Sequence, residues 1–112
     1  MSNNAGANIT HCGTVAYVDG IYQAVTGTGN WSVAPIIPTS VPVGQVQITF
    51  NTAITGPYSV LLTARRTADA PLLTANWGDQ TPDGFVVVLY NPVGTRTYTT
   101  VRNGDFSFAV LE

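Results

Sequence analysis

The sequence is poor in charge and contains no lysine. Charged residues make up 9% of the 112 residues, against about 25% in an ordinary soluble domain. The basic side chains are four arginines, and the net charge is −2. A nucleic-acid-binding surface needs a basic patch against the phosphates, so the composition argues against such a partner. Low charge is typical of particle-exposed β-proteins and of chains that hide surface in an oligomer.

Histidine and cysteine each occur once, as His11 and Cys12. A single cysteine cannot form an internal disulfide, so the fold does not rely on oxidation. One copy of the chain cannot supply a Cys/His zinc site. Neighbouring residues of a strand point to opposite faces, so His11 and Cys12 are separated and do not form a catalytic pair. We therefore expect no metal and no cofactor. His11 is then an ordinary residue of the first strand or lead-in. The alternative is that three copies of His11 form an ion site on a trimer axis.

Long apolar runs are absent as well. A membrane-spanning helix needs about 20 consecutive apolar residues, so we predict no membrane insertion. The first residues have neither the basic region nor the apolar core of a signal peptide. We expect residues 1–10 to form a flexible lead-in and residues 11–112 to form one domain.

A helical period of apolar residues is also missing, whereas glycine, proline and β-branched residues recur along the whole chain. Asp19-Gly20 and Asn103-Gly104 are hairpin dipeptides, because both positions tolerate a positive φ. Strands are predicted at 14–18, 21–26, 31–33, 45–52, 58–65, 72–77, 84–90, 96–101 and 104–112. This spacing predicts an all-β fold, an antiparallel and jelly-roll-like β-sandwich.

The final strand carries apolar or small side chains on both of its faces. Phe106, Phe108 and Val110 alternate on one face, and the opposite face carries Ser107, Ala109 and Leu111, which are small or apolar. The run 85–90 is apolar on both faces too, as in a strand that is covered on both sides. In so short a chain this predicts packing against further copies, most simply a homotrimer. The residues predicted at that interface are Leu61, Arg65, Val86, Val88 and Leu111. For Arg65, the alternative is a solvated charge that blunts a strand end.

Two tryptophans lie in polar surroundings, in Asn30-Trp31-Ser32 and Asn76-Trp77-Gly78-Asp79. An aromatic platform beside amide and carboxylate groups is the usual composition of a sugar site, while the alternative is a large buried ring at the end of the sandwich. Asp79 and Asp83 lie in one turn-rich segment, where aspartate usually caps its own backbone. The candidate ligand-binding residues are Asn30, Trp31, Trp77, Asp79 and Asp83. We expect no catalytic residues, since a glycosidase needs two acids across a cleft.

Several segments together resemble the C-terminal receptor-binding domains of bacteriophage tail fibres and related viral fibre proteins. These segments are Gly13-Thr14-Val15, Gly27–Val33, Gly44–Phe50, Tyr58-Ser59-Val60 with Thr63-Ala64, Gly84-Phe85-Val86-Val87 and Asp105–Val110. The resemblance implies a β-sandwich of which three copies pack around a fibre axis. It also implies a virion location at the fibre tip. No set of functional residues carries over, because the binding loops of such domains vary freely.

The resemblance implies a role in adhesion. Exposed loops of a trimer would contact a host cell-surface glycan or protein, and three equivalent sites would add avidity to weak single contacts. The candidate contact loops are 27–31, 66–71 and 77–83. Two other readings remain open: a structural trimeric module that caps or decorates a virion, and a free carbohydrate-binding lectin.

Overall fold

The computed structural model describes residues 8–36, 45–65, 74–90 and 104–112, and these form eight strands and no helix. The strands are β1 (Ile9–Val18), β2 (Ile21–Gly27), β3 (Trp31–Pro35), β4 (Gln45–Phe50), β5 (Ser59–Arg65), β6 (Thr74–Thr81), β7 (Gly84–Tyr90) and β8 (Asp105–Leu111). Every strand pairing is antiparallel. The predicted all-β, antiparallel fold is thus confirmed.

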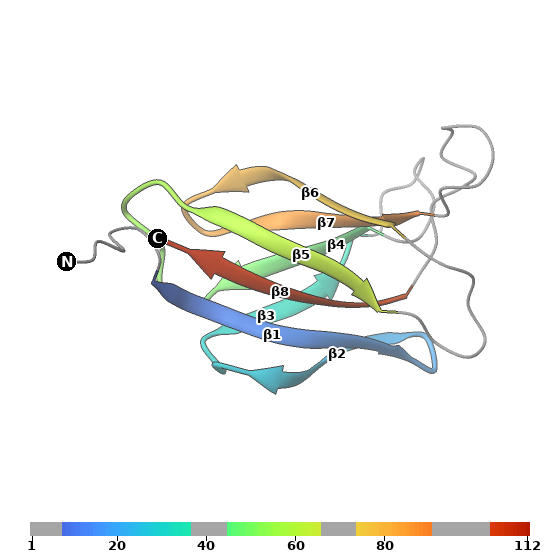
Figure 1. Ribbon diagram of the computed structural model, residues 1–112. Helices are drawn as coiled ribbons and strands as arrows, with labels where there is room; N and C mark the ends of the chain where they lie inside the picture. Colours follow the sequence, from blue (N-terminus) through green and yellow to red (C-terminus); the bar gives the residue numbers. More distant parts are fainter. Residues whose placement is uncertain (1–7, 37–44, 66–73, 91–103) are drawn as a thin grey trace.

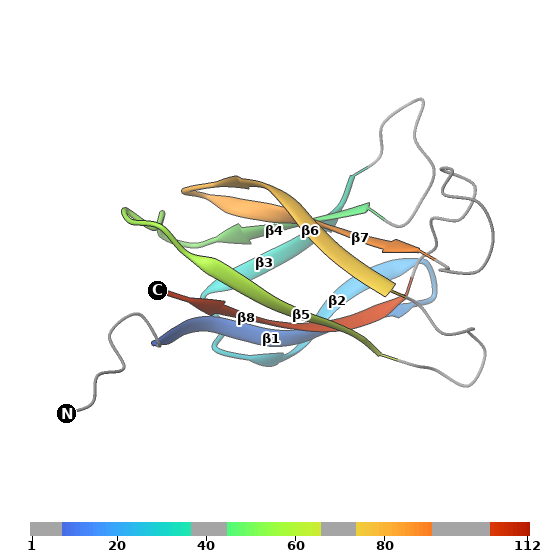
Figure 2. The ribbon, with the colours of Figure 1, turned by 45° about the horizontal axis from the view of Figure 1, so that its top comes forward.

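The strands form two four-stranded sheets that lie face to face (Figures 1 and 2). Sheet A has the order β2-β1-β8-β5, and sheet B has the order β3-β4-β7-β6. The chain passes from one sheet to the other between β2 and β3, between β4 and β5, between β5 and β6, and between β7 and β8. Edge strands of the two sheets meet on both sides, β2 beside β3 and β5 beside β6.

The core is built from alternate residues of the inner strands, as the period of two requires. On β4 the buried side chains are Val46, Ile48 and Phe50, which alternate along the strand. Phe85 of β7 lies at the centre of the aromatic packing, with its ring centroid 5.6 Å from that of Phe108 and 6.0 Å from that of Phe50. Edge-to-face contacts of this kind add to the stability that burial itself provides.

The final strand is a central strand of sheet A, between β1 and β5. Phe106, Phe108 and Val110 point into the core and are at most 4% exposed. Their neighbours Ser107, Ala109 and Leu111 are half-buried on the outer face of the sheet. The predicted strand at 104–112 is thus confirmed, with observed bounds Asp105–Leu111.

Local predictions had mixed outcomes. Asp19 and Gly20 form the predicted hairpin turn, with φ values of 52° and 83°. The predicted contact loop 77–83 is wrong up to Thr81, because β6 runs on to that residue through an irregularity after Gly78. Asp79 accommodates that irregularity with a φ of 49°. β1 begins at Ile9, inside the predicted lead-in. The predicted strand 96–101 lies outside the described residues.

The two ends of the sandwich differ. Asn8 and Glu112 lie together at one end, where the Glu112 amide donates to the Asn8 carbonyl oxygen at 3.0 Å. We call this the terminal end. The register places the Asp19-Gly20 turn at the opposite end, the hairpin end. The last residues of β3, β5 and β7 and the first of β4, β6 and β8 also lie there.

Candidate functional site

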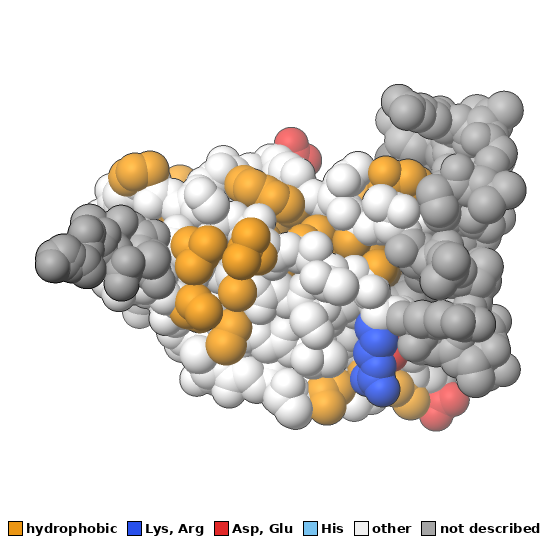
Figure 3. Space-filling model, viewed as in Figure 1, with side chains coloured by type: hydrophobic (Ala, Val, Ile, Leu, Met, Phe, Trp, Pro, Cys, Tyr) orange, Lys and Arg blue, Asp and Glu red, His pale blue; other side chains and the backbone are white. Residues whose placement is uncertain are grey.

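The outer face of sheet A carries an apolar group of side chains near the terminal end. The strand register aligns Ile9 with Leu111. Two residues before Leu111 on β8, Ala109 is aligned with Cys12 on one side and with Leu61 on the other. We call these five residues the apolar level. Figure 3 shows hydrophobic side chains gathered over this part of the face.

Two large aliphatic side chains of the apolar level are exposed to solvent. Ile9 is 57% exposed and Leu61 is 59% exposed. Among the described residues, every exposed large hydrophobic side chain belongs to sheet A; the other three are Val18, Ile21 and Val25. Sheet B contributes none within the described ranges, so the two outer faces of the sandwich are chemically unequal. An exposed apolar patch of this kind marks an interaction surface more often than a site of chemistry.

The middle of the same face carries hydroxyl groups. Thr63, Ser107, Thr14 and Thr26 follow one another across β5, β8, β1 and β2. The Thr14 Oγ1 and Ser107 Oγ atoms are 3.0 Å apart and share a hydrogen bond. We call these four residues the hydroxyl level. A hydroxyl can both donate and accept, so this level suits a partner that presents the same groups.

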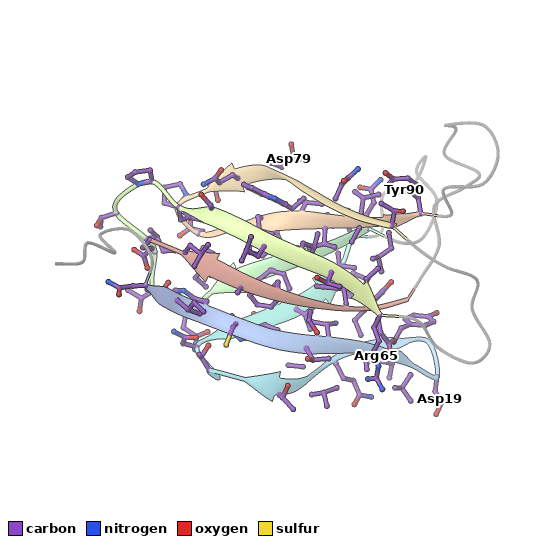
Figure 4. The ribbon with its side chains drawn as sticks, in the orientation of Figure 1. Asp19, Arg65, Asp79 and Tyr90 are labelled. Carbon is purple, nitrogen blue, oxygen red and sulfur yellow. The ribbon has the colours of Figure 1, made fainter. Side chains whose placement is uncertain are left out.

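Beyond the hydroxyl level, the face carries one charge of each sign. Arg65 of β5 pairs with Asp105 of β8, and we call these two residues the charged level. Asp105 is only 9% exposed, and its Oδ1 accepts a hydrogen bond from the Tyr17 amide at 2.8 Å. Arg65 is exposed at the end of β5 (Figure 4). Cross-strand pairs of opposite charge stabilise a sheet modestly.

The five predicted interface residues divide between the two outer faces. Leu61, Arg65 and Leu111 share the outer face of sheet A. Val86 and Val88 lie instead on the outer face of sheet B, where they pair with Gln47 and Gln45. Val86 is only 9% exposed within the single chain. The structure therefore gathers three of the five residues on one face and places the other two on the opposite side.

Trp31 lies in the core, although the sequence offered it as a sugar platform. It is 6% exposed, and its ring packs edge-on against Phe108 with a centroid separation of 4.8 Å. Its Nε1 donates to the Cys12 carbonyl oxygen at 2.9 Å. A platform must offer a free ring face to the sugar, so this geometry favours the alternative of a buried core tryptophan.

Asn30 holds the turn before β3. Its Nδ2 donates to the Thr10 carbonyl oxygen at 3.1 Å, and its Oδ1 accepts from Thr28 Oγ1. Its own carbonyl oxygen accepts from the Asn51 amide at 2.9 Å. Both polar atoms of the side chain are therefore engaged within the protomer, and a ligand would have to displace one of them.

Trp77, Asp79 and Asp83 form a second group at the other edge of sheet B. Trp77 is half-buried against Phe85, with a centroid separation of 6.2 Å. Asp79 is exposed and points away from the sandwich (Figure 4), and Asp83 is exposed in the β6–β7 turn. β4 and β7 separate β3 from β6, which at ~4.8 Å per strand places these two strands roughly 14 Å apart. The register also sets Trp77 level with Pro35, four residues along β3 from Trp31. They do not build one site.

A hydrogen-bonded segment that begins at the end of β4 connects the turn of Asn30 with the β6–β7 turn of Asp83. The Phe50 amide donates to the Asp83 carbonyl oxygen, and the Ile54 amide donates to the Pro82 carbonyl oxygen, both at 2.8 Å. The Tyr58 hydroxyl lies 2.8 Å from the carbonyl oxygens of Thr81 and Gly84. Burial raises the pKa of this hydroxyl. This role of Tyr58 was not predicted, because it depends on contacts with Thr81 and Gly84, which are distant in the sequence.

A groove of about 240 Å³ lies beside β2 and the turn that follows it. Its walls are Ala24, Val25, Thr26, Gly27, Gly29 and Trp31. Pockets for small molecules usually enclose roughly 300–1,000 Å³ and place a few polar side chains toward the ligand. This groove is smaller, and Thr26 supplies the one polar side chain of its walls.

His11 is buried inside the protomer at the terminal end. It is 7% exposed, and its ring centroid lies 4.4 Å from that of Phe50. Its Nδ1 is 2.9 Å from Thr10 Oγ1. Desolvation lowers the pKa of His11, and the Glu112 charge opposes that shift. Because the ring points into the core, this arrangement favours the alternative of an ordinary strand residue over an ion site shared between copies.

A metal site has no geometric basis in the described ranges. Within them, no three His, Cys, Asp or Glu side chains converge as metal ligands would. The same ranges include no helix with the length and hydropathy that crossing a membrane requires. No protein-family model, curated protein or solved structure matches the chain.

Proposed function

We propose that this protein is a non-enzymatic attachment domain that assembles as a homotrimer at the tip of a viral fibre. Its loops would contact a host cell-surface receptor, a glycan in the first instance. The resemblance to bacteriophage tail-fibre domains motivates the viral setting. The jelly-roll-like connectivity belongs to the same proposal. It is supported by the pairing of β1 with β8 and by the repeated passage of the chain between sheets.

The apolar level of sheet A is the observation that carries the proposal. Burying a large aliphatic side chain contributes about 1.5–3 kcal/mol relative to leaving it exposed. Ile9 and Leu61 keep more than half of their surface in water in the single chain, so covering them would stabilise an assembly. A chain with 9% charged residues has few groups that oppose such an association.

The absence of a catalytic role is part of the proposal. Asp79 and Asp83 are both exposed, with Asp79 in β6 and Asp83 in the turn that follows it, not across a cleft. His11, the one histidine of the chain, is turned into the core. A binding or structural role needs neither a nucleophile nor a general base, and a repeated surface on a stable sandwich suffices for it.

A structural capping module without a receptor is the second candidate, and a specific observation favours it. Trp31 and Asn30, the residues best suited to a sugar site in the sequence, serve the protomer fold instead. A cap would assemble through the same outer face of sheet A and would need no glycan-binding loop.

Two measurements separate these functions. Light scattering on the purified chain gives the number of copies, and a trimer is expected for both the attachment domain and the cap. Binding to a broad glycan array and to candidate host cells is expected only for the attachment domain. A trimer that binds neither glycans nor host cells would support the capping module. A stable monomer would exclude both the attachment domain and the capping module. A monomer that binds glycans would point to a free lectin.

A further inference from the structure

The outer face of sheet B carries amides and hydroxyls where sheet A carries exposed apolar groups. Val86 and Val88 lie on this face, and the residues that share it follow from the register and from alternation along each strand. None of the described residues assigned to it in this way is charged, and none is an exposed large hydrophobic residue. Its polar residues include Ser32, Gln45, Gln47, Thr49, Asn76 and Tyr90.

The side-chain amide of Gln47 is held in place on this face. Its Nε2 donates to the Ile48 carbonyl oxygen at 2.9 Å and to the Phe85 carbonyl oxygen at 3.2 Å. Its Oε1 accepts no hydrogen bond from the residues that the structure describes. A ligand hydroxyl that meets this oxygen finds an acceptor whose position is already fixed, which lowers the entropy lost on binding.

A second amide, that of Asn76, holds an aromatic ring on the same face. Its Nδ2 donates to the Tyr90 hydroxyl at 3.1 Å. Tyr90 is aligned with Thr74, two residues from Asn76, so its side chain leans along the sheet to make this bond. Tyr90 is half-buried at the hairpin end of β7 (Figure 4), which leaves part of the ring open to a ligand. An aromatic ring can pack against the apolar face of a sugar.

Open space lies above Gly78 on this face. Gly78 is aligned with Val86, which is aligned in turn with Gln47. A Cβ at residue 78 would meet no heavy atom within 4 Å. The backbones of β4 and β6 are two strand spacings apart, or roughly 10 Å. Between the two amides, Val86 and Val88 form a low apolar floor, so the face has room for an extended ligand.

We propose that the outer face of sheet B binds an uncharged glycan chain. The inference rests on the proposed attachment function and gives the glycan a site on a sheet face, where the sequence had suggested loops. Gln47 Oε1 and Asn76 Oδ1 would accept hydrogen bonds from sugar hydroxyls, and the Tyr90 ring would pack against a sugar ring. Assembly through the outer face of sheet A would leave this face open in every copy.

The charges of the described residues favour an uncharged glycan over an acidic one. Arginine is well suited to bind carboxylates and phosphates, but Arg65, the one arginine that the structure describes, lies on sheet A. The described charges of sheet B and its β6–β7 turn are Asp79 and Asp83, which would repel an anion. A protein partner usually anchors on large side chains at the centre of an interface, whereas the centre of this face is Val86 and Gly78.

Binding to an array that holds uncharged oligosaccharides and acidic ones, sialylated or phosphorylated, tests the site. Gly78→Gln fills the open space above the floor, and Asn76→Ala removes an acceptor from an exposed position. The matched controls are Gly56→Gln, where a Cβ also meets nothing within 4 Å, and Asn51→Ala, an exposed amide in the segment after β4. Urea denaturation and light scattering show whether each variant keeps the fold and the number of copies.

The wild type should bind uncharged glycans, and each of the two site variants should bind them about tenfold more weakly or worse, with both controls unchanged. Binding to acidic glycans alone, or unchanged affinity in either folded site variant, would overturn this site and leave the attachment function standing. A trimer that binds host cells but no glycan would also overturn the site and would point to a protein receptor. A trimer that binds neither would overturn the attachment function and the site together.

Discussion

The indole of Trp31 lies over Gly13, and the missing side chain of Gly13 is what gives the ring its place. A Cβ at residue 13 would collide with Trp31 Cζ2 and would lie 2.5 Å from the Thr26 carbonyl oxygen. Gly13 pairs with Phe108, whose ring meets the indole edge-on. The contact joins β1, β3 and β8, and therefore links both sheets at the terminal end.

Gly13→Ala should destabilise the protomer for this reason. Overpacking of a filled core costs about 1–3 kcal/mol, and here one of the obstructing atoms belongs to the backbone. Urea denaturation of the variant measures the loss. Gly56→Ala is the matched control, since nothing lies within 4 Å of a Cβ at that position. Equal stability of the two variants would contradict the packing described for Trp31.

Trp31→Ala should destabilise the protomer more than Trp77→Ala does. Truncating a buried aromatic side chain typically costs about 3–5 kcal/mol, and Trp31 is buried whereas Trp77 is half-buried. The free energy of unfolding is the quantity to compare. If Trp31→Ala kept full stability but lost binding to a glycan, the tryptophan would be a platform after all.

Leu111→Asp should weaken the assembly without unfolding the protomer. Leu111 belongs to the apolar level on the outer face, and a carboxylate there would have to be desolvated on association. Light scattering across a dilution series should show dissociation at a concentration at least ten times higher than for the wild type. Thr49→Asp, on the exposed outer face of sheet B, is the control. An unchanged assembly in Leu111→Asp would remove that face as the interface.

Acid should destabilise the protomer through His11. Burial lowers the pKa of His11 below 6.5 in the folded chain, so the unfolded chain binds the proton more readily. Stability is therefore full above pH 6.5 and declines as the pH falls from there toward the folded pKa. The midpoint of urea unfolding at pH 7.5 and pH 5.5 measures the decline. His11→Gln should show a smaller difference between these two pH values, and an equal difference would exclude His11 as the cause.

Alkali should destabilise the protomer through Tyr22. Burial is the main cause that raises the pKa of Tyr22 to about 12, and the Tyr17 and Asp105 charges act in the same direction. Because the hydroxyl in the unfolded chain titrates near 10, stability falls as the pH rises from about 10 toward 12. Thermal unfolding of the wild type and Tyr22→Phe at pH 9 and pH 11 tests this. The variant should lose less stability over that interval.

Alternation in the sequence was enough to predict the inner strands. Phe106, Phe108 and Val110 face the core as their spacing required, and the Asp19-Gly20 turn has the positive φ values that its residues permit. The extension of β6 to Thr81 could not be anticipated. Residues 78–81 resemble a turn locally, and only pairing with β7 across an irregularity makes them part of a strand.

The candidate site was less accessible to sequence reasoning. A polar neighbourhood in sequence did not reveal that Trp31 is buried, because the ring is enclosed by Gly13 and Phe108 from distant strands. Likewise, Leu61 and Val86 were both predicted to lie at one interface between copies of the chain. Only the order of strands in the sheets assigns them to opposite sides of the sandwich. Such assignments depend on tertiary contacts that alternation along one strand does not contain.

The number of copies in solution tests most directly whether further copies of this chain cover the outer face of sheet A. Size-exclusion chromatography with light scattering on the wild-type chain and on Leu61→Asp measures it. A homotrimer predicts three times the 11.8 kDa chain mass for the wild type and a smaller mass for Leu61→Asp. A wild type that stays at 11.8 kDa at all accessible concentrations would show that no further copies cover this face.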